Sequence, residues 1–174
     1  DLICWGTHYF CKMPSESKRV SWHQDASYWP LTPSQTVTVW LAIDDADLEN
    51  GAMQVVPGSH HHGQIDFASS AGDENNVLNQ TVKDAVVYGE APVALAMKAG
   101  QISLHTDLLL HGSDPNRSVR RRCGLTMRFV PPVVRALNGW NGNAVICRGT
   151  DGSGHWTHYP RPDGDELPQA KTRP

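Results

Sequence analysis

The clearest strand in the sequence is Gln35-Thr36-Val37-Thr38-Val39-Trp40-Leu41-Ala42-Ile43, a run rich in β-branched residues. Because side chains alternate along a strand, Thr36, Thr38 and Trp40 share one face, and valine and leucine occupy the other. A polar and aromatic face suits the interior of a barrel that holds a ligand. The apolar face would pack outward against a second layer. The stretch therefore predicts a β-rich fold around a binding cavity.

The flanking chain continues this pattern of short strands separated by turns. Fifteen glycines and twelve prolines punctuate runs rich in Val, Thr, Trp and Ile. The other predicted strands are 5–10, 20–25, 52–56, 82–87, 93–97, 102–104, 108–111 and 122–130. Many short antiparallel strands with long excursions predict a sandwich, barrel or jelly roll. Long amphipathic helices are missing, so we expect any flanking helices upstream of Asp1.

The length of 174 residues favours a single domain with a substantial core. We assign that core to residues 1–134, with the polar, turn-rich stretch 61–79 as an excursion or lid. Residues 135–174 are expected to form an irregular C-terminal extension packed on the core. The chain opens at Asp1 directly in an apolar run, so we expect that an upstream part is absent.

Composition bears on partners and compartment. Fifteen basic and 18 acidic residues give no sign of a nucleic-acid or membrane-surface partner. No run of about 18 apolar residues predicts a membrane span. The four cysteines lie far apart without a CxxC pair, which predicts reduced, mostly buried thiols in a cytoplasmic protein. The oligomeric state is left open.

His23 and Asp25 are candidate metal ligands, within the stretch Ser21-Trp22-His23-Gln24-Asp25-Ala26-Ser27-Tyr28-Trp29-Pro30. Residues two apart on an extended strand point to the same face. Imidazole plus carboxylate is two-thirds of the 2-His-1-carboxylate triad that holds non-heme Fe(II) with open positions. An isolated His-x-Asp is more often a surface turn, so the interpretation needs a second histidine. The candidate is His111, in Leu108-Leu109-Leu110-His111-Gly112-Ser113.

Other histidines compete for this role. His105 lacks the Gly-Ser context of His111, so we expect it at a barrel or rim position. Three adjacent imidazoles, as in His60-His61-His62, cannot all face one ion on a strand, and this run predicts a surface loop. His8 and Lys12 share one face of the first strand, where a place near the pocket and a purely structural role are both open.

Arg122 opens the apolar strand 122–130, whereas Arg120 and Arg121 predict a solvated turn. A guanidinium fork beside a metal can bind a carboxylate through two hydrogen bonds. 2-Oxoglutarate needs such a partner, because its keto-acid end chelates iron and its distal carboxylate must be neutralised inside the barrel.

Taken together, these motifs resemble the phytanoyl-CoA dioxygenase family of Fe(II)/2-oxoglutarate oxygenases. The matching pieces are Trp22-His23-Gln24-Asp25 with Tyr28-Trp29-Pro30, the stretch 50–60 (NGAMQVVPGSH), and Leu109-Leu110-His111-Gly112-Ser113 through Asn116 to Arg122. They span about residues 5–131 in the family's order and approximate spacing.

The resemblance implies a double-stranded β-helix, the cupin-like jelly roll, with iron held by His23, Asp25 and His111. It implies that Arg122 anchors the distal carboxylate of 2-oxoglutarate. The further cosubstrate contacts that it suggests are Thr38, Ser113, Gln24 and Trp40. The candidate substrate contacts are Tyr28, Trp29 and His8, with buried packing as the alternative for the two aromatic residues.

The predicted function is an Fe(II)- and 2-oxoglutarate-dependent oxygenase that uses O₂ to hydroxylate an unactivated C–H bond of a small organic molecule, releasing succinate and CO₂. Halogenating relatives replace the carboxylate ligand by a small residue, so Asp25 favours hydroxylation. Two alternatives remain open: a cupin-like metal enzyme that does not use 2-oxoglutarate, and a metal-free binding module on the same fold. The sequence does not identify a substrate.

Overall fold

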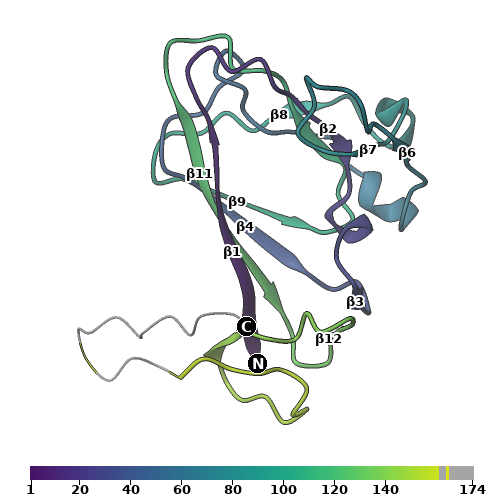
Figure 1. Cartoon of the computed structure of the whole chain (residues 1–174), viewed down its shortest axis with the longest axis vertical. Coiled ribbons are helices and arrows are strands. Elements are labelled where there is room, and N and C mark those ends of the chain that lie inside the picture. The colour runs from purple at the N-terminus through teal and green to yellow at the C-terminus, as the bar shows by residue number, and fades with distance from the viewer. Residues whose placement is uncertain (161–163, 165–174) are drawn as a thin grey trace.

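The larger of two facing sheets is five-stranded and antiparallel, in the order β13-β1-β11-β4-β9 (Figure 1). The structure is a computed structural model that describes residues 1–160 and residue 164. The strands of this sheet are β1 (Leu2–Lys12), β4 (Val37–Ala42), β9 (Ile102–Thr106), β11 (Arg122–Val130) and β13 (Val145–Arg148). Strand β11 lies at its centre, between β1 and β4.

The smaller sheet has the order β2-β10-β5-β8. Its strands are β2 (Val20–His23), β5 (Gln54–Val55), β8 (Val93–Ala94) and β10 (His111–Ser113). Two strand pairs complete the fold: β3 (Leu31–Thr32) with β12 (Arg135–Ala136), and β6 (Ala68–Ser69) with β7 (Gln80–Thr81). Two antiparallel sheets enclosing a cavity form a jelly roll, which confirms the predicted mainly β fold.

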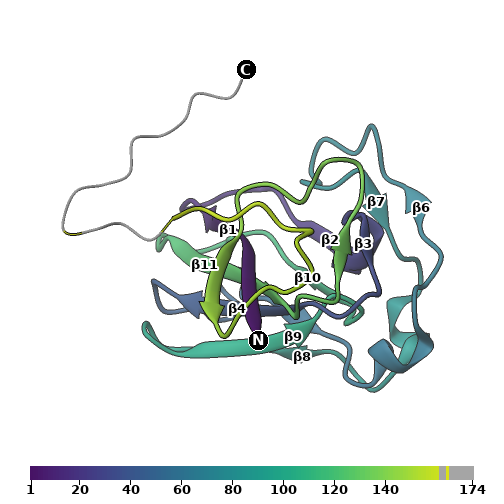
Figure 2. The same ribbon diagram turned by 90° about the horizontal axis from the view of Figure 1, so that it is seen from below.

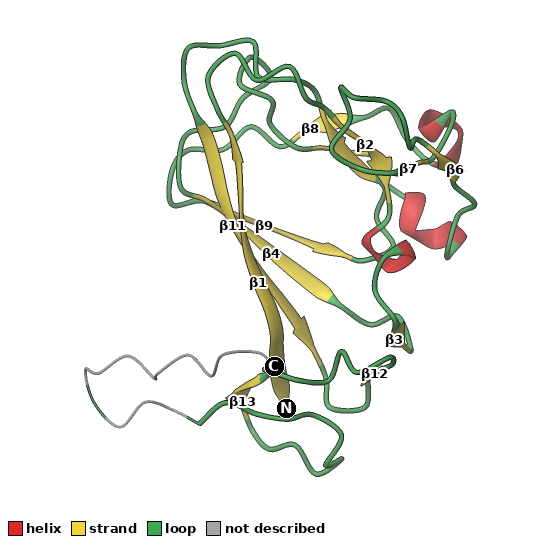
Figure 3. Ribbon diagram, viewed as in Figure 1, coloured by secondary structure: helices red, strands yellow, loops and turns green. Residues whose placement is uncertain are grey.

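The helices in the described part of the chain are three short 3₁₀ turns. They are η1 (Asp25–Ser27), η2 (Ser59–His62) and η3 (Ala85–Tyr88), and all lie on the side of the smaller sheet (Figure 3). Across residues 1–160, no helix has the length and apolarity to cross a membrane.

The alternation predicted for β4 is confirmed. Thr38 and Trp40 are buried with exposed fractions of 1% and 3%, whereas Val37 is 46% exposed. Strand β11 likewise buries polar side chains, because its buried positions include Arg122, Thr126 and Arg128. The polar faces of both strands thus line the interior. Within residues 1–160, no second layer buries Val37, which differs from the outward packing that we expected.

The strand predicted at 122–130 is confirmed, but two others are wrong. Residues 82–87 form no strand, because Asp84 adopts a left-handed backbone conformation (φ 49°) and begins η3. Strand β10 begins only at His111, since the preceding residues form a turn in which the Leu109 amide donates to Thr106 O at 3.1 Å. Asp25 likewise lies beyond the end of β2.

The segment 61–79, predicted as an excursion or lid, packs against β2. Asn76 is 9% exposed; it accepts from the Ser21 amide at 3.0 Å and donates to Ser21 Oγ at 2.9 Å. Ile65 enters an apolar cluster with Val56 and Leu110. Seen from below, β6 and β7 lie on the side of β2 that faces away from the larger sheet (Figure 2).

Cys11 and Cys123 form a disulfide, so the prediction of four reduced thiols is wrong for this pair. The two cysteines are direct partners in the β1–β11 register, with Cα atoms 4.1 Å apart. Their separation of 112 residues hides this proximity in the sequence. Cys4 and Cys147 are free thiols.

The predicted extension at 135–174 is described only in part. Within that part, Ala136, Ala144 and Trp156 share one apolar cluster with Ile3 and Val130, at the end of the larger sheet near the N-terminus. The indole of Trp156 donates to Val134 O at 3.0 Å. The irregular tail predicted after this point lies largely outside the described residues, and the boundary at residue 134 stays a prediction.

Candidate metal centre

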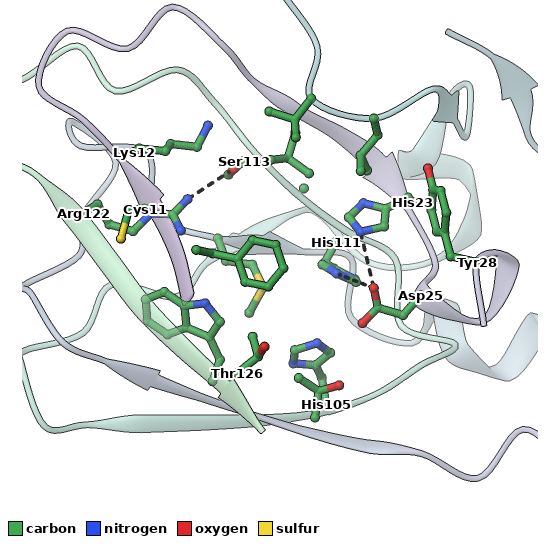
Figure 4. A pocket seen from close by; sticks show the side chains of 18 of the residues that line it. Cys11, Lys12, His23, Asp25, Tyr28, His105, His111, Ser113, Arg122 and Thr126 are labelled. Carbon is green, nitrogen blue, oxygen red and sulfur yellow. Dashed lines mark hydrogen bonds and ion pairs between the residues drawn. The ribbon is translucent and has the colours of Figure 1, made fainter. Parts of the chain in front are cut away.

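Two histidines and one aspartate converge where strand β2, strand β10 and the turn η1 meet. His23 ends β2, His111 begins β10, and the two are direct partners in the antiparallel register. Asp25 opens η1 and turns back towards them, with Oδ1 3.6 Å from His23 Nε2 and 3.8 Å from His111 Nε2. One ligand atom from each residue lies within 4.8 Å of the others (Figure 4). This is the arrangement that a single metal ion needs.

The backbone sets the protonation of both imidazoles. His23 Nδ1 lies 2.8 Å from Ser21 O, and His111 Nδ1 lies 2.9 Å from Leu109 O. A carbonyl oxygen can only accept, so each Nδ1 must carry the proton. In the neutral ring, Nε2 then has a free lone pair, and in both residues it faces Asp25. Such fixing of the second nitrogen is typical of histidine metal ligands.

Burial and neighbouring charge favour the metal-binding protonation states. Burial, reinforced by the neighbouring His23, lowers the pKa of His111 to about 3, which keeps this ring neutral at pH 7. Burial alone would raise the pKa of Asp25. The imidazoles of His111 and His23 outweigh that effect and lower the pKa of Asp25 to about 2. The cluster therefore offers a neutral imidazole at His111 and a carboxylate at Asp25, beside the imidazole of His23.

Arg122 lies at the opposite end of the same cavity, beside Ser113 (Figure 4). It is 5% exposed, and burial lowers its pKa to about 10. Its Nε and Nη2 donate to Gly51 O at 3.0 and 2.8 Å, and Nη2 lies 3.4 Å from Ser113 Oγ. No carboxylate lies within 4.0 Å of it in residues 1–160. This buried cation thus lacks a countercharge, which suits an acidic ligand.

The Asn50-Gly51 motif positions this guanidinium. Asn50 is fully buried; its side chain accepts from the Asp47 amide at 2.8 Å and donates to Asp45 O at 2.8 Å. Gly51 has a φ of 77°, which L-residues rarely adopt, and a Cβ there would lie 2.6 Å from Asp114 O. The turn therefore requires glycine, and it presents the Gly51 carbonyl to Arg122.

Of the other predicted cosubstrate contacts, Thr38, Ser113 and Trp40 line the cavity. Thr38 Oγ1 is buried without a hydrogen-bond partner in the described part of the chain. The ring of Trp40 lies 5.7 Å from Arg122 Cζ. These placements bring the predicted contacts together, whereas their roles toward a cosubstrate stay proposals.

Gln24 does not line the cavity. Its amide donates to Gly63 O at 2.8 Å and to Leu108 O at 2.6 Å, and its carbonyl accepts from the Ile65 amide at 2.7 Å. A residue between two ligands on a strand points to the opposite face, and no distortion turns Gln24 back. The geometry therefore gives Gln24 a structural role in place of the predicted cosubstrate contact.

Tyr28 and Trp29 line the cavity, and the ring centroid of Tyr28 lies 6.0 Å from that of His23. Their role toward a substrate stays a proposal. The hydroxyl of Tyr28 is buried and has no partner within residues 1–160. His8 is exposed and accepts at Nδ1 from Arg128 Nη1, which lies 2.7 Å away. His105 is buried with its ring centroid 5.0 Å from that of His111, but it is not part of the cluster.

The cavity has a volume of about 390 Å³, in the range of small-molecule sites. Both sheets and the excursion contribute to it, the latter through Val77 and Leu78. Arg128 and Thr126 also line its wall, and neither was among the residues predicted from the sequence. Both have the parity of Arg122 along β11, so strand alternation was the signal that predicts them.

Comparison with known proteins identifies the family. The family model for phytanoyl-CoA dioxygenase (PhyH) matches residues 1–124. The chain belongs to the phytanoyl-CoA dioxygenase family. It is 31% identical over 127 residues to a phytanoyl-CoA dioxygenase domain-containing protein 1 homolog of Dictyostelium discoideum, covering 72% of this chain and 45% of that protein. It is 30% identical over 149 residues to a probable alpha-ketoglutarate-dependent hypophosphite dioxygenase of Stutzerimonas stutzeri, covering 85% and 52%.

A solved structure in this comparison is the apo form of the non-heme monooxygenase ThoJ. It matches with a TM-score of 0.76 and 29% identity, over 95% of this chain and 59% of ThoJ. The chain thus spans about half the length of these proteins, and it contains the jelly roll with its cavity.

Proposed function

We propose that this chain is the catalytic core of an Fe(II)- and 2-oxoglutarate-dependent oxygenase that hydroxylates a small organic molecule. The observation that carries the proposal is the convergence of His23 Nε2, His111 Nε2 and Asp25 Oδ1 in a buried cavity. Family membership supports it, as does the name of the hypophosphite dioxygenase, which specifies alpha-ketoglutarate. ThoJ also has a structure as a nickel complex, matching at 30% identity.

The residues present fit a divalent iron. Two neutral imidazoles and one carboxylate are the ligands of the facial triad, which leaves coordination positions open. When bound, iron and 2-oxoglutarate supply the oxidation of a C–H bond by O₂, with release of succinate and CO₂. His23, Asp25 and His111 would hold the metal, and the Nδ1 hydrogen bonds to Ser21 O and Leu109 O would fix the orientation of both rings.

The far end of the cavity fits the acidic cosubstrate. Arg122 would bind its distal carboxylate with the guanidinium edge that Gly51 O leaves free. Ser113 would donate to that carboxylate. The Thr38 hydroxyl, which has no partner within residues 1–160 and lies in the strand row of His105, would donate to oxygens at the other end of the cosubstrate. The indole of Trp40 would flank its carbon chain and keep water from the ion pair, which strengthens electrostatic attraction.

The substrate would enter beside Tyr28 and Trp29, which line the cavity. His8 does not line it and is linked to it through its hydrogen bond with Arg128. Aromatic walls there would exclude water from the reacting bond. A small-molecule substrate, the absence of a nucleic-acid or membrane partner, and a cytoplasmic location stay predictions.

Metal binding gives a direct test. Titration calorimetry with Mn(II) should show one site in the wild type, and Asp25→Ala and His111→Ala should each weaken it at least roughly 100-fold. Loss of groups that merely contact ligands already costs about 10–100-fold. His61→Ala is the matched control, because His61 is exposed and lies outside the cluster. Equal Mn(II) affinity in His111→Ala and His61→Ala would refute the metal site.

Cosubstrate use separates the oxygenase from the two alternatives. Arg122→Met removes charge-assisted hydrogen bonds worth about 3 kcal/mol, so the Kd for 2-oxoglutarate should rise roughly 100-fold while Mn(II) still binds. A cupin-like enzyme that does not use 2-oxoglutarate would bind Mn(II) but form no succinate. A metal-free binding module would neither bind Mn(II) nor form succinate.

A further inference from the structure

A second arginine lies buried in the cavity, and neither the metal nor the cosubstrate accounts for it. Arg128 is 7% exposed and lines the cavity from the same face of β11 as Arg122. Six residues at about 3.3 Å each separate the two Cα atoms by roughly 20 Å. The two guanidiniums thus belong to opposite parts of the cavity.

The hydrogen bonding of Arg128 is incomplete. Its Nη1 donates to His8 Nδ1 at 2.7 Å, whereas Nε is buried without an acceptor in the described part of the chain. His8 accepts at Nδ1, and its partial burial, together with the positive charge of Arg128, lowers its pKa, so this imidazole brings no countercharge. No carboxylate of residues 1–160 lies within 4.0 Å of the guanidinium. A buried donor left unpaired costs about 1–3 kcal/mol.

Aromatic rings surround this charge. Arg128 Cζ lies 4.9 Å from the ring centroid of Trp29, 5.8 Å from Trp5 and 6.0 Å from Phe10. Cation–π contacts stabilise a guanidinium, but they do not satisfy its N–H groups. The rings also exclude water, which strengthens the attraction of any anion that enters.

The charges of the cavity leave Arg128 unbalanced. The acidic residues lining the cavity are Glu16 and Asp25. Glu16 acts on Lys12, which is the β1 partner of Arg122, and Asp25 belongs to the metal cluster. The two positive charges of Fe(II) and the two negative charges of 2-oxoglutarate would cancel. The lining cations Lys12, Lys18, Arg122 and Arg128 then outnumber the two lining carboxylates. Asp25 attracts Arg128 without contacting it, so the guanidinium itself has room for an anion.

We propose that Arg128 recognises an oxyanion on the substrate, a carboxylate or a phosphonate, which binds its free N–H edge next to Trp29. The inference rests on the proposed function and names the substrate class of that site. In the sheet, Arg128 pairs with Thr38, and Thr38 pairs with His105, whose ring neighbours His111. Two strand spacings of about 4.8 Å span this row. The oxidised carbon should thus lie only a few bonds from the anionic group, in a compact organic acid.

Calorimetry with matched probes tests the proposal. The probes are hexanoate, pentylphosphonate and hexanamide, titrated into protein loaded with Mn(II) and 2-oxoglutarate and also into metal-free protein. We expect the two anions to bind at millimolar concentration and the amide to bind at least roughly tenfold more weakly. Hexanoate and pentylphosphonate in separate titrations distinguish the two sources of the oxyanion.

Arg128→Met should weaken binding of the preferred anion roughly 10- to 100-fold, and Arg128→Lys should retain part of it. Replacing a buried unpaired charge by an apolar side chain is often neutral or stabilising, so Arg128→Met should fold. Arg121→Met is the matched control, because Arg121 is exposed and paired with Asp44 at 2.7 Å. It should bind every probe as the wild type does.

Three outcomes would overturn the proposal: no anion binding, equal affinity for hexanamide, or unchanged anion affinity in Arg128→Met. Mn(II) and 2-oxoglutarate affinities should be unchanged in Arg128→Met. If the wild type binds neither Mn(II) nor 2-oxoglutarate, the proposed function fails. The metal-free titration still decides on Arg128, since its oxyanion site contains no metal ligand.

Discussion

Gly124→Ala should damage both the stability of this protein and its cosubstrate site. Gly124 lies on the interior face of β11, directly beneath the indole of Trp40. A Cβ at this position would lie 2.8 Å from Trp40 Cη2 and closer still to Cζ2 and Cε2. Carbon atoms prefer a separation of about 3.5–4.0 Å, so the ring must move by roughly 1 Å or more.

The indole has one direction in which to move. Trp40 is 3% exposed and packs against Ala42, Ala52 and Met53, so the open space is the cavity beside Arg122. Overpacking of this kind costs about 1–3 kcal/mol, which lowers the Tm of a chain of this size by roughly 2–12 °C. Losing the contact between Trp40 and Arg122, worth about 1 kcal/mol, should raise the Kd for 2-oxoglutarate at least roughly fivefold.

Thermal unfolding and 2-oxoglutarate titration of the Mn(II)-loaded protein measure the two effects. Gly142→Ala is the control, because a Cβ at Gly142 meets no atom within 4 Å and its φ is not positive. The reasoning is refuted if Gly124→Ala has the same Tm as Gly142→Ala and binds 2-oxoglutarate with wild-type affinity.

Two further predictions concern the buried polar groups. The pKa of His111 is about 3 in the folded state and about 6.5 in the unfolded chain, which therefore binds one more proton between these pH values. The free energy of unfolding of the metal-free protein should thus fall by about 1.4 kcal/mol for each pH unit below 6.5 from this residue alone. Urea titrations at several pH values from 7 to 5 measure this free energy. It should change less with pH in His111→Gln than in His61→Gln, and an equal pH dependence would contradict the argument. Gln24→Ala should cost about 2–4 kcal/mol, because it leaves two carbonyls and the Ile65 amide without partners, yet 2-oxoglutarate affinity should not change. The control is Gln101→Ala, which removes one exposed hydrogen bond, and a Gln24→Ala variant as stable as this control would count against the structural role.

Local patterns in the sequence were sufficient for β4 and β11, two of the strands that line the cavity. Alternation of polar and apolar residues predicted the faces of β4 and the full extent of β11, because period two is a property of the extended backbone itself. The same reasoning failed at 82–87, where a single left-handed residue, Asp84, ends the extended run. A backbone reversal at one non-glycine position leaves no periodic signal.

The candidate site was also predictable only in part. The pair His23 and Asp25 was visible as a spacing rule, and the motif around His111 suggested a third ligand. Only the antiparallel register of β2 and β10 places the three donor atoms within 4.8 Å of one another. The register of β1 with β11 likewise decides that Cys11 meets Cys123, whereas the spacing of the cysteines had favoured reduced thiols.

The sequence by itself determined the ligand types, the inward face of β4 and the presence of Arg122. The tertiary structure decided which buried groups have partners. Arg122 and Arg128 have no carboxylate within 4.0 Å in residues 1–160, whereas the side chain of Gln24 hydrogen-bonds to three backbone groups. The physical reason is that residue types and alternation are local, whereas hydrogen-bond satisfaction depends on groups brought together from distant strands.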